Sequence, residues 1–336
     1  MPTALKGLKV LDFSTLLPGP FASMYLADMG AEVIHVESPS RPDLVRIMPP
    51  YANGQATAHS YLNRNKQSIA LDLKDAANIE MIRNKISEFD ILLEQFRPDV
   101  MRRLGLDYDT LAEINPRLIY CSITGYGQTG TYKDRAGHDI NYLALAGVSG
   151  HSGRQDGGPP PLGIQIADVA GGSLHAVIGI LAAVVERQRS GMGQYIDISM
   201  TDCVASLNSM AASASLAGQT PQGPEQGMLN GAIFYDYYET KDGRYFSVGS
   251  LEPQFMTGLA AALDLPILMA KGSSFDPEDR QAIKQALKEK FSSKDFAEWQ
   301  SIFSQLDICV EPVLSLDEAL TSPIAKQRGW VVNVPL

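Results

Sequence analysis

Short hydrophobic runs alternate with helical patterns along the first 130 residues. The stretch 21–29 has helical spacing and ends at Gly30. Continuous apolar runs of strand length occur before and after it, at 9–13, 32–37, 90–94 and 118–123. Strands that alternate with helices predict an α/β fold whose large domain is a doubly wound, mostly parallel sheet.

The second half of the chain predicts a long helix, a further strand and then a smaller α/β domain. Apolar residues follow Asp168 at helical spacing as far as Arg189, and 194–199 reads as a strand. After a Pro, Gly and Gln-rich segment, an Asp-Gly turn joins two strand patterns. We therefore expect the following division: a large domain over 1–217, a linker over 218–231, a small domain over 232–311, and a return to the large domain over 312–336.

Composition excludes several classes of partner. The formal net charge of −10 argues against nucleic acid, and a polyanionic ligand would need a local basic site. The three cysteines are far apart, which favours neither a disulfide framework nor a cysteine metal site. The longest weakly apolar stretch, 169–185, contains Ser173 and His175 and is shorter than a membrane span. We expect a soluble, cytoplasmic protein without a metal.

The first strand–helix–strand unit resembles a nucleotide-binding unit but predicts no nicotinamide site. Glu37 ends the second strand, where a ribose-binding acid would lie. The first turn, however, reads Leu-Leu-Pro18-Gly19-Pro20 rather than Gly-x-Gly-x-x-Gly. Its two prolines lack the backbone N–H groups that a pyrophosphate site uses.

His138 and Asp168 are the candidate proton carriers. His138 follows a glycine at the start of a helical segment, and Asp168 precedes Ala170-Gly171-Gly172 at the start of an apolar helix. A helix N-terminus with glycines offers free N–H groups to a ligand and stabilises negative charge. A His and an Asp in one pocket can exchange protons with a carbon centre. Taken singly, each has a plainer reading as a helix-capping residue.

The order of motifs resembles the family III CoA-transferase superfamily and, within it, the racemases of α-methylacyl-CoA. The resemblance runs from Leu5 to the C-terminus and rests on Ala-Gly-His138-Asp-Ile-Asn-Tyr142, Asp168-Val-Ala-Gly-Gly and Gly191-x-Gly-Gln-Tyr-Ile-Asp197. It implies catalytic roles for His138 and Asp168. It also implies that Glu252, otherwise an ordinary loop acid, approaches His138.

The resemblance also implies where the CoA part of a substrate binds. Arg64, Lys66 and Lys74 surround a strand and form a local basic cluster, which would otherwise read as a solvated charge group. Glu37 departs from the CoA-binding Arg of several racemases, and Arg41 is a candidate to compensate. The full implied set is Arg41, Arg64, Lys66, Leu71, Lys74, Phe96, Arg103, Gly125, Gly137, Asp139 and Tyr142.

Three functions remain open at this point. A racemase would invert C2 of 2-methyl-branched acyl-CoA thioesters by proton transfer through an enolate, with no cofactor beyond the CoA of the substrate. A CoA-transferase would use Asp168 as a nucleophile and form a mixed anhydride. The third is a non-catalytic CoA-binding homologue. The Gly-His-Asp-Ile-Asn-Tyr string favours the racemase, and the resemblance implies an interlocked homodimer.

Overall fold

The computed structural model describes residues 3–220, 222–274 and 276–333, which form two compact units. The first unit comprises Met1–Gly150 and Pro160–Pro221, and the second comprises His151–Pro159 and Gln222–Leu336. The segment His151–Pro159 is therefore part of the second unit although the chain on both sides of it belongs to the first.

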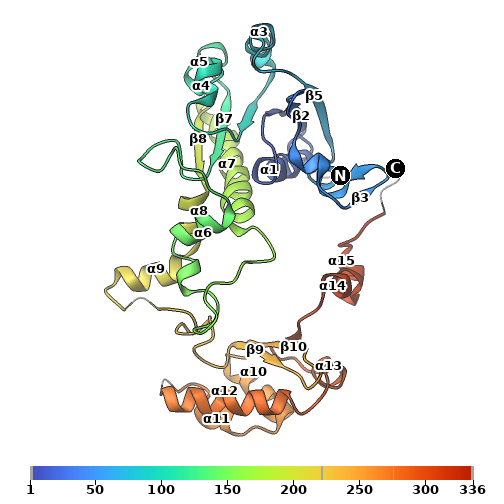
Figure 1. Ribbon diagram of the computed structural model, residues 1–336, viewed down its shortest axis with the longest axis vertical. Coiled ribbons are helices and arrows are strands. Elements are labelled where there is room, and N and C mark those ends of the chain that lie inside the picture. The colour runs from blue at the N-terminus through green and yellow to red at the C-terminus, as the bar shows by residue number, and fades with distance from the viewer. Residues whose placement is uncertain (1–2, 221, 275, 334–336) are drawn as a thin grey trace. The chain divides into compact units, whose positions relative to one another are not determined.

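A six-stranded parallel sheet forms the centre of the first unit (Figure 1). Its order is β5-β2-β1-β6-β7-β8, and every neighbouring pair is parallel. The strands are β1 Lys9–Asp12, β2 Glu32–Glu37, β5 Lys66–Ala70, β6 Ile91–Glu94, β7 Ile119–Thr124 and β8 Tyr195–Ser199. The order reverses between β1 and β6, which is where doubly wound sheets bind ligands. The predicted fold class is confirmed for this unit.

Two hydrophobic cores cover the two faces of the sheet, because successive strand residues point to opposite sides. On one face, Val10 and Leu93 pack with α1 Pro18–Asp28 and α7 His175–Ser190. On the other, Leu11 and Leu92 pack in a second cluster. That cluster includes residues of the helices α3 Ala76–Lys85, α4 Val100–Leu104 and α5 Tyr108–Ile114.

The remaining elements of the first unit lie at the carboxyl ends of the strands or in their connections. The segment between β2 and β5 contains short elements: η1 Leu44–Ile47, β3 Tyr51–Ala52, β4 Gln55–Ala56 and α2 Thr57–Leu62. The later ones are η2 Ile86–Glu88, α6 Asp139–Leu145, η3 Ser149–His151, the π-helix η4 Ala167–Leu174, α8 Met200–Leu207 and α9 Ser209–Leu216.

The second unit contains a three-stranded antiparallel sheet packed with helices. Its strand order is β11-β10-β9, from β9 Asp236–Glu239, β10 Tyr245–Val248 and β11 Val310–Pro312. The helices are α10 Pro253–Leu263, α11 Ile267–Lys271, α12 Pro277–Phe291, α13 Phe296–Phe303, α14 Leu316–Thr321 and α15 Pro323–Arg328. The predicted Asp-Gly hairpin is confirmed between β9 and β10.

The C-terminal segment belongs to the second unit. Val313 donates its N–H to the carbonyl of Tyr245, and Glu318 pairs with Arg244 at 2.8 Å. The expected return of 312–336 to a large domain concerns the placement of the two units, so it stays a prediction.

The helix that runs through η4 and α7 agrees with the predicted one within a residue at each end and extends beyond the apolar stretch 169–185. It spans Ala167–Ser190, and its 24 residues, with a mean hydropathy of 1.8 in the most apolar window, meet the length and composition of a membrane span. One such helix is weak evidence for a membrane, because core helices have the same character, and 39% of this window is buried. The absence of a membrane partner stays a prediction.

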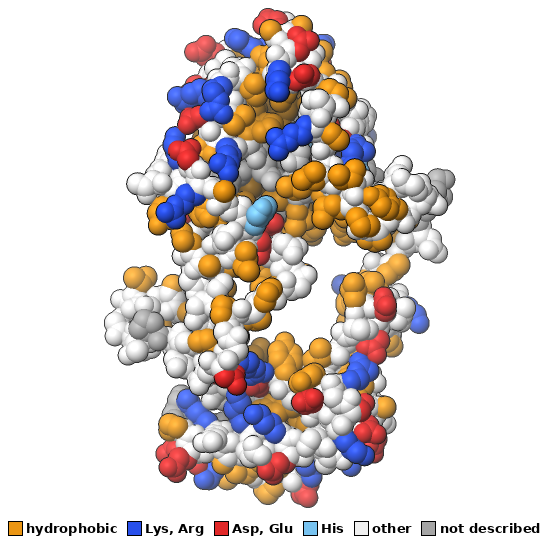
Figure 2. All heavy atoms as spheres, in the orientation of Figure 1, with side chains coloured by type: hydrophobic (Ala, Val, Ile, Leu, Met, Phe, Trp, Pro, Cys, Tyr) orange, Lys and Arg blue, Asp and Glu red, His pale blue; other side chains and the backbone are white. Residues whose placement is uncertain are grey.

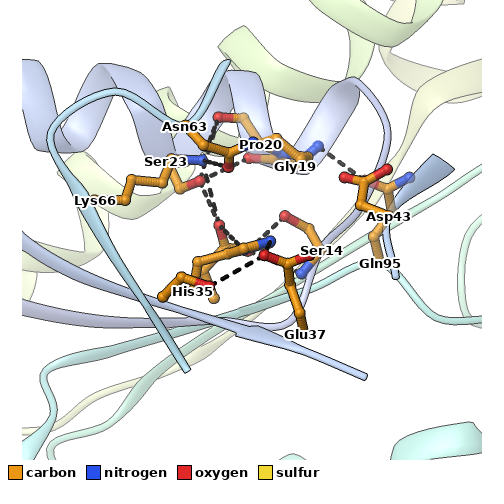
Figure 3. Close-up of polar contacts among 12 residues, drawn as sticks. Ser14, Gly19, Pro20, Ser23, His35, Glu37, Asp43, Asn63, Lys66 and Gln95 are labelled. Carbon is orange, nitrogen blue, oxygen red and sulfur yellow. Dashed lines mark hydrogen bonds and ion pairs between the residues drawn. The ribbon is translucent and has the colours of Figure 1, made fainter. Parts of the chain in front are cut away.

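A buried ionic cluster ties β1, β2 and β5 to the start of α1 (Figure 3). Asp12, at the end of β1, accepts hydrogen bonds from both hydroxyls of Ser14 and Ser23. His35 Nδ1 lies 3.3 Å and Lys66 Nζ 3.6 Å from the same carboxylate. Burial alone would raise the pKa of Asp12, but the hydrogen bond from His35 and the charge of Lys66 outweigh it and hold the pKa well below its usual range.

The turn between β1 and α1 is fixed by this cluster and by three further contacts. Gly19 donates its N–H to Gln95 Oε1 at 2.8 Å, and Lys66 Nζ donates to the carbonyl of Pro20 at 2.9 Å (Figure 3). Leu16 has a φ of 64°, a costly conformation for a branched residue, and its N–H donates to Asp43 Oδ2. The turn after β1, where the strand order of the sheet reverses, is therefore held by contacts to Asp43, Lys66 and Gln95.

We predict that Lys66→Met destabilises the protein far more than Lys74→Met. Lys66 is 1% exposed, and its removal leaves the buried Asp12 charge without its cation, which costs about 3–5 kcal/mol. Lys74 is exposed, and its replacement should cost less than about 0.5 kcal/mol. Urea unfolding of both variants measures the difference. Equal losses would contradict the role assigned to Lys66.

Candidate functional site

His138 lies at the N-terminus of α6, in extended backbone just before the helix. Its side chain is exposed, and its backbone N–H donates to Asn141 Oδ1 at 3.0 Å. This contact fixes the first turn of α6 through the backbone of His138. The imidazole itself is therefore left at the surface of the unit.

Tyr142 anchors the loop that leads into His138. Its side chain is buried, its hydroxyl donates to the carbonyl of Gly137 at 2.6 Å, and its ring meets Tyr126 edge-on. A Cβ atom at Gly137 would lie 2.7 Å from the Tyr142 ring, and one at Gly125 would lie 2.5 Å from it. Both glycines are required for this packing. Three residues that the resemblance implied for CoA binding thus also set the position of His138.

Asp168 lies in the first turn of η4, an eight-residue π-helix that continues into α7. π-Helical turns are rare and occur frequently at functional sites. Here Ser173 donates its hydroxyl to the carbonyls of Pro18 (2.6 Å) and Asp168 (3.1 Å). These bonds connect the interior of η4 to the start of α1 and to the peptide of Asp168.

The glycines after Asp168 do not face a ligand, contrary to the sequence prediction. Gly171 and Gly172 are buried, and a Cβ at Gly171 would lie 3.0 Å from the carbonyl oxygen of Met200 in α8. A Cβ at Gly172 would lie 3.1 Å from Pro18. They are glycines because α8 and α1 pack directly against the η4 backbone, so these two positions leave no room for a ligand.

Asp139 binds two backbone N–H groups at the start of η4, those of Ala167 and of Asp168 itself. Its Oδ1 accepts from the N–H of Ala167 at 2.6 Å and from that of Asp168 at 3.0 Å. The helix begins one residue before Asp168, so the carboxylate of α6 caps it from outside. Asp139 therefore joins the segments that carry His138 and Asp168.

The environment raises the pKa of Asp168 to about 6. Partial burial is the main cause, and the negative charge of Asp139 adds to it, while His138 lowers the pKa. The effect of His138 shows that the two candidate proton carriers lie within electrostatic reach of one another. A carboxyl group that titrates near neutral pH is suited to general acid–base work.

Glu252 lies in the second unit, at the exposed N-terminus of α10. Partial burial and, second, the charge of Glu252 raise the pKa of the Cys309 thiol in the same unit. The approach of Glu252 to His138 stays a prediction.

The predicted basic cluster is divided between two roles. Lys66 belongs to the buried cluster around Asp12, and Arg64 contacts Asp28 through Nε and Nη2. Lys74 is exposed. The implied nucleotide site therefore retains Lys74 and the exposed part of Arg64, but Lys66 has no free charge for a phosphate.

The other residues implied for CoA lie around the strand ends of the same unit. Arg41 and Arg103 are exposed, and Figure 2 shows Lys and Arg side chains gathered over the end of this unit that carries α3, α4 and α5. Leu71 and Phe96 are half-buried and pack against the core cluster that contains Leu11 and Leu92. Glu37 is buried and held by Arg46, whose hydrogen bond lowers the pKa of Glu37 to about 2. Glu37 is therefore a structural anion.

Glu94, the last residue of β6, was not among the predicted site residues. It is 3% exposed and accepts from the N–H of Phe96 at 2.7 Å, and burial raises its pKa to about 7. The signal in the sequence was an acid that ends a buried apolar run.

Among the residues that the structure describes, no group of three or more His, Cys, Asp or Glu is placed to hold a metal ion.

Comparison with known proteins decides the family. Residues 5–336 match the CoA-transferase family III. The chain belongs to this family. It is 41% identical to mouse α-methylacyl-CoA racemase over 334 residues, which cover 98% of this chain and 82% of the relative. It is 33% identical to human succinyl-CoA:glutarate CoA-transferase, with 98% and 76% covered.

A solved structure agrees with the fold. A CaiB/BaiF family protein from Brucella suis has a TM-score of 0.85 at 30% identity, and the match covers 98% of this chain and 89% of that one. The predicted resemblance to an isomerase is confirmed, because the racemases are isomerases. The relatives of this family III chain thus include acyl-CoA racemases and CoA-transferases.

We predict that Asp139→Asn lowers the pKa of Asp168 below about 6. The amide oxygen can still accept from the two N–H groups, but the negative charge that opposes ionisation of Asp168 is removed. The 13C shift of the Asp168 carboxyl, followed against pH, measures the change. The control is Asp197→Asn in β8, a carboxyl that does not act on Asp168. An unchanged titration in Asp139→Asn would refute the electrostatic account.

Proposed function

We propose that this protein is a racemase that inverts C2 of 2-methyl-branched acyl-CoA thioesters. The observation that carries the proposal is the position of Asp168, half-buried, within electrostatic reach of His138 and with a pKa of about 6. One group removes the C2 proton, the thioester carbonyl accepts the electron pair as an enolate, and the conjugate acid of the other group returns a proton to the opposite face. No electron is lost or gained.

The chain's own residues have separate tasks in this scheme. Asp139 holds the peptide of Asp168 and raises its pKa, while Gly137 and Tyr142 hold the peptide before His138. The imidazole of His138 is exposed and can meet the acyl group. CoA is bound as part of the substrate, and we propose no metal or redox cofactor.

The second candidate is CoA transfer between carboxylic acids. Its support is the 33% identity to succinyl-CoA:glutarate CoA-transferase and the presence of one accessible carboxyl group, Asp168. In that reaction the carboxylate attacks the thioester carbonyl, CoA leaves as the thiolate, and an aspartyl anhydride forms. The higher identity to racemases favours the first proposal. The cytoplasmic location stays a prediction.

The two-base scheme predicts that the protein incorporates solvent deuterium at C2 of a 2-methylacyl-CoA without any acceptor acid. His138→Gln and Asp168→Asn should each lower inversion by about 10²-fold or more, because each removes one proton carrier. Mass spectrometry and chiral analysis of the ester measure both effects. Glu186→Gln, an exposed change on α7, is the control.

Two outcomes would redirect the assignment. Full inversion in either variant would refute the two-base scheme. A transferase would be identified by three results together. The parent takes up no deuterium, Asp168→Asn loses CoA transfer to an added acid, and His138→Gln keeps normal transfer.

We further propose that the active form is an interlocked homodimer. The support is an exposed apolar stripe on α7, where Ile178 is 62% and Val185 56% exposed, together with Leu216 of α9 at 89%. Figure 2 shows hydrophobic side chains exposed in patches on this unit. A surface of this kind is typical of contact with another chain.

We expect light scattering to give a dimer that persists at nanomolar concentration. Refolding a His138→Ala chain together with a Glu252→Ala chain should restore part of the activity, if the two residues of one site come from different subunits. Each variant refolded alone is the control. A fully active monomer would exclude this assembly.

A further inference from the structure

A cavity of about 290 Å³ opens over β6, β7 and β8, on the face of the first unit's sheet that α4 and α5 cover. As far as the chain is described, its lining includes neither candidate proton carrier and none of the residues that the resemblance implied for CoA. The cavity is therefore separate from the site already described. We call it the Glu94 pocket, after a lining that includes Glu94, Tyr108, Tyr120, Ser122 and Tyr195.

The register of the parallel strands builds one wall of the Glu94 pocket from two rows of side chains. In the first row, Glu94 lies opposite Ser122, and Ser122 lies opposite Asp197. In the second row, two positions earlier on β7 and β8, Tyr120 lies opposite Tyr195. Residues two positions apart on a strand point to the same face. A row with two carboxyl groups therefore lies next to an aromatic row.

Glu94 is a buried carboxyl group that has hydrogen-bond donors but no counter-ion. It is 3% exposed and accepts from the N–H of Phe96 at 2.7 Å. Within the described residues, no Lys, Arg or His pairs with it. Burial raises its pKa to about 7 and the charge of Asp197 adds to this, while hydrogen bonds from Ser122 and Phe96 oppose it. A buried carboxylate without a cation is costly, so a cation brought by a ligand would stabilise the ionised form.

The two arginines of the lining have contacts of their own. Arg102 Nη2 lies 3.8 Å from Asp109, and Arg97 Nη1 donates to the carbonyl of Asp134 at 3.4 Å. The acids of the lining outnumber the arginines and are Glu94, Asp99, Asp107 and Asp109. This excess of negative charge favours a cationic ligand over an anionic one.

Three tyrosine rings line the pocket together with Glu94. The ring centroids of Tyr108, Tyr120 and Tyr195 lie 5.6 to 6.1 Å apart, and the ring planes differ by 35° to 72°. Tyr195 donates its hydroxyl to Ser122 at 3.2 Å, which links the aromatic row to the polar one. Aromatic faces attract an organic cation within about 6 Å, and the recognition of quaternary ammonium groups uses such rings.

We propose that the Glu94 pocket binds a small organic ammonium ion, with the cation against the Glu94 carboxylate and its alkyl groups against the tyrosine rings. The cavity volume is at the lower end of the range for ligand sites, so the ligand is small. The binding requires neither racemase nor transferase chemistry, and the inference goes beyond the proposed function.

Calorimetric titration of the full-length protein with choline tests the pocket without reference to activity. The control ligand is 3,3-dimethylbutan-1-ol, which has the shape of choline with a carbon atom in place of the charged nitrogen. Choline should bind at one site per chain and at least tenfold more tightly than the alcohol, because only the cation is attracted by Glu94 and by the rings. Equal affinities, or no binding of choline, would overturn the proposal.

Variants of the lining test which residues bind the cation. Glu94→Gln should weaken choline binding at least tenfold and leave binding of the alcohol unchanged, because the amide keeps an acceptor for the N–H of Phe96 but has no charge. Glu113→Gln, an exposed change on α5 outside the lining, is the matched control and should bind choline like the parent. Unchanged choline affinity in a folded Glu94→Gln protein would overturn the proposal.

Two substitutions of Tyr195 decide the question even if Glu94→Gln fails to fold. Tyr195 is 38% exposed. Tyr195→Leu should weaken choline binding about fivefold because the ring is lost, whereas Tyr195→Phe keeps the ring and should bind choline like the parent. Equal choline affinity in the two variants would count against the pocket.

The dependence of choline affinity on pH reports on Glu94 itself. Between pH 6 and 8 the ionised fraction of a group with a pKa of about 7 rises from about 0.1 to about 0.9, so affinity should rise about tenfold. The rise should persist in Glu113→Gln and disappear in Glu94→Gln. Its survival in Glu94→Gln would assign it to another group and overturn the role of Glu94. The neighbouring titratable groups on β7 and β8 are Tyr120, Cys121, Tyr195 and Asp197.

Discussion

The buried carboxylate of Asp12 is the interaction on which the first unit depends. A fully buried charge is tolerated only when donors and cations surround it, and here these come from the β1–α1 turn, from α1, from β2 and from β5. The same contacts determine how α1 leaves the sheet. The carbonyl of Pro18, at the start of α1, accepts a hydrogen bond from the hydroxyl of Ser173. The position of η4 therefore depends on that of α1. The Asp12 carboxylate positions α1 through Ser23, and α1 positions η4 through Ser173.

Close packing explains why η4 is a π-helix with two glycines. α8 and α1 approach its backbone to distances that a Cβ would not permit, so the interior face of η4 is committed to packing. Asp168, in the first turn, stays half-buried outside this packing, and Asp139 contacts its N–H from α6. One carboxylate therefore positions the other by hydrogen bonds to backbone N–H groups and raises its pKa by charge. Asp139 therefore affects both the backbone position and the pKa of Asp168.

The sequence predicted the parallel sheet, the hairpin of the second unit and the neighbourhood of His138 and Asp168, because these depend on local periodicity and on motif order. It could not predict what depends on distant partners. Lys66 read as a phosphate ligand because its partner, Asp12, lies 54 positions away. Gly171 and Gly172 read as an open anion site because α8 follows them in the chain and covers them only in the fold. The ion pairs of Arg154 could not be predicted, because its partners Glu225 and Asp236 are distant in the sequence.

The pKa of Asp168 bears differently on the two chemistries. At pH 7 a group with a pKa of about 6 is roughly nine-tenths ionised, so it can act either as a base or as a nucleophile. A raised pKa strengthens a base toward a C–H bond, since proton transfer from carbon becomes less unfavourable. It also makes the carboxylate a poorer leaving group from an anhydride, which a transferase must break in its second half-reaction. In the two proposed reactions, the raised pKa of Asp168, caused by burial first and by the charge of Asp139 second, is therefore better suited to proton transfer than to acyl transfer.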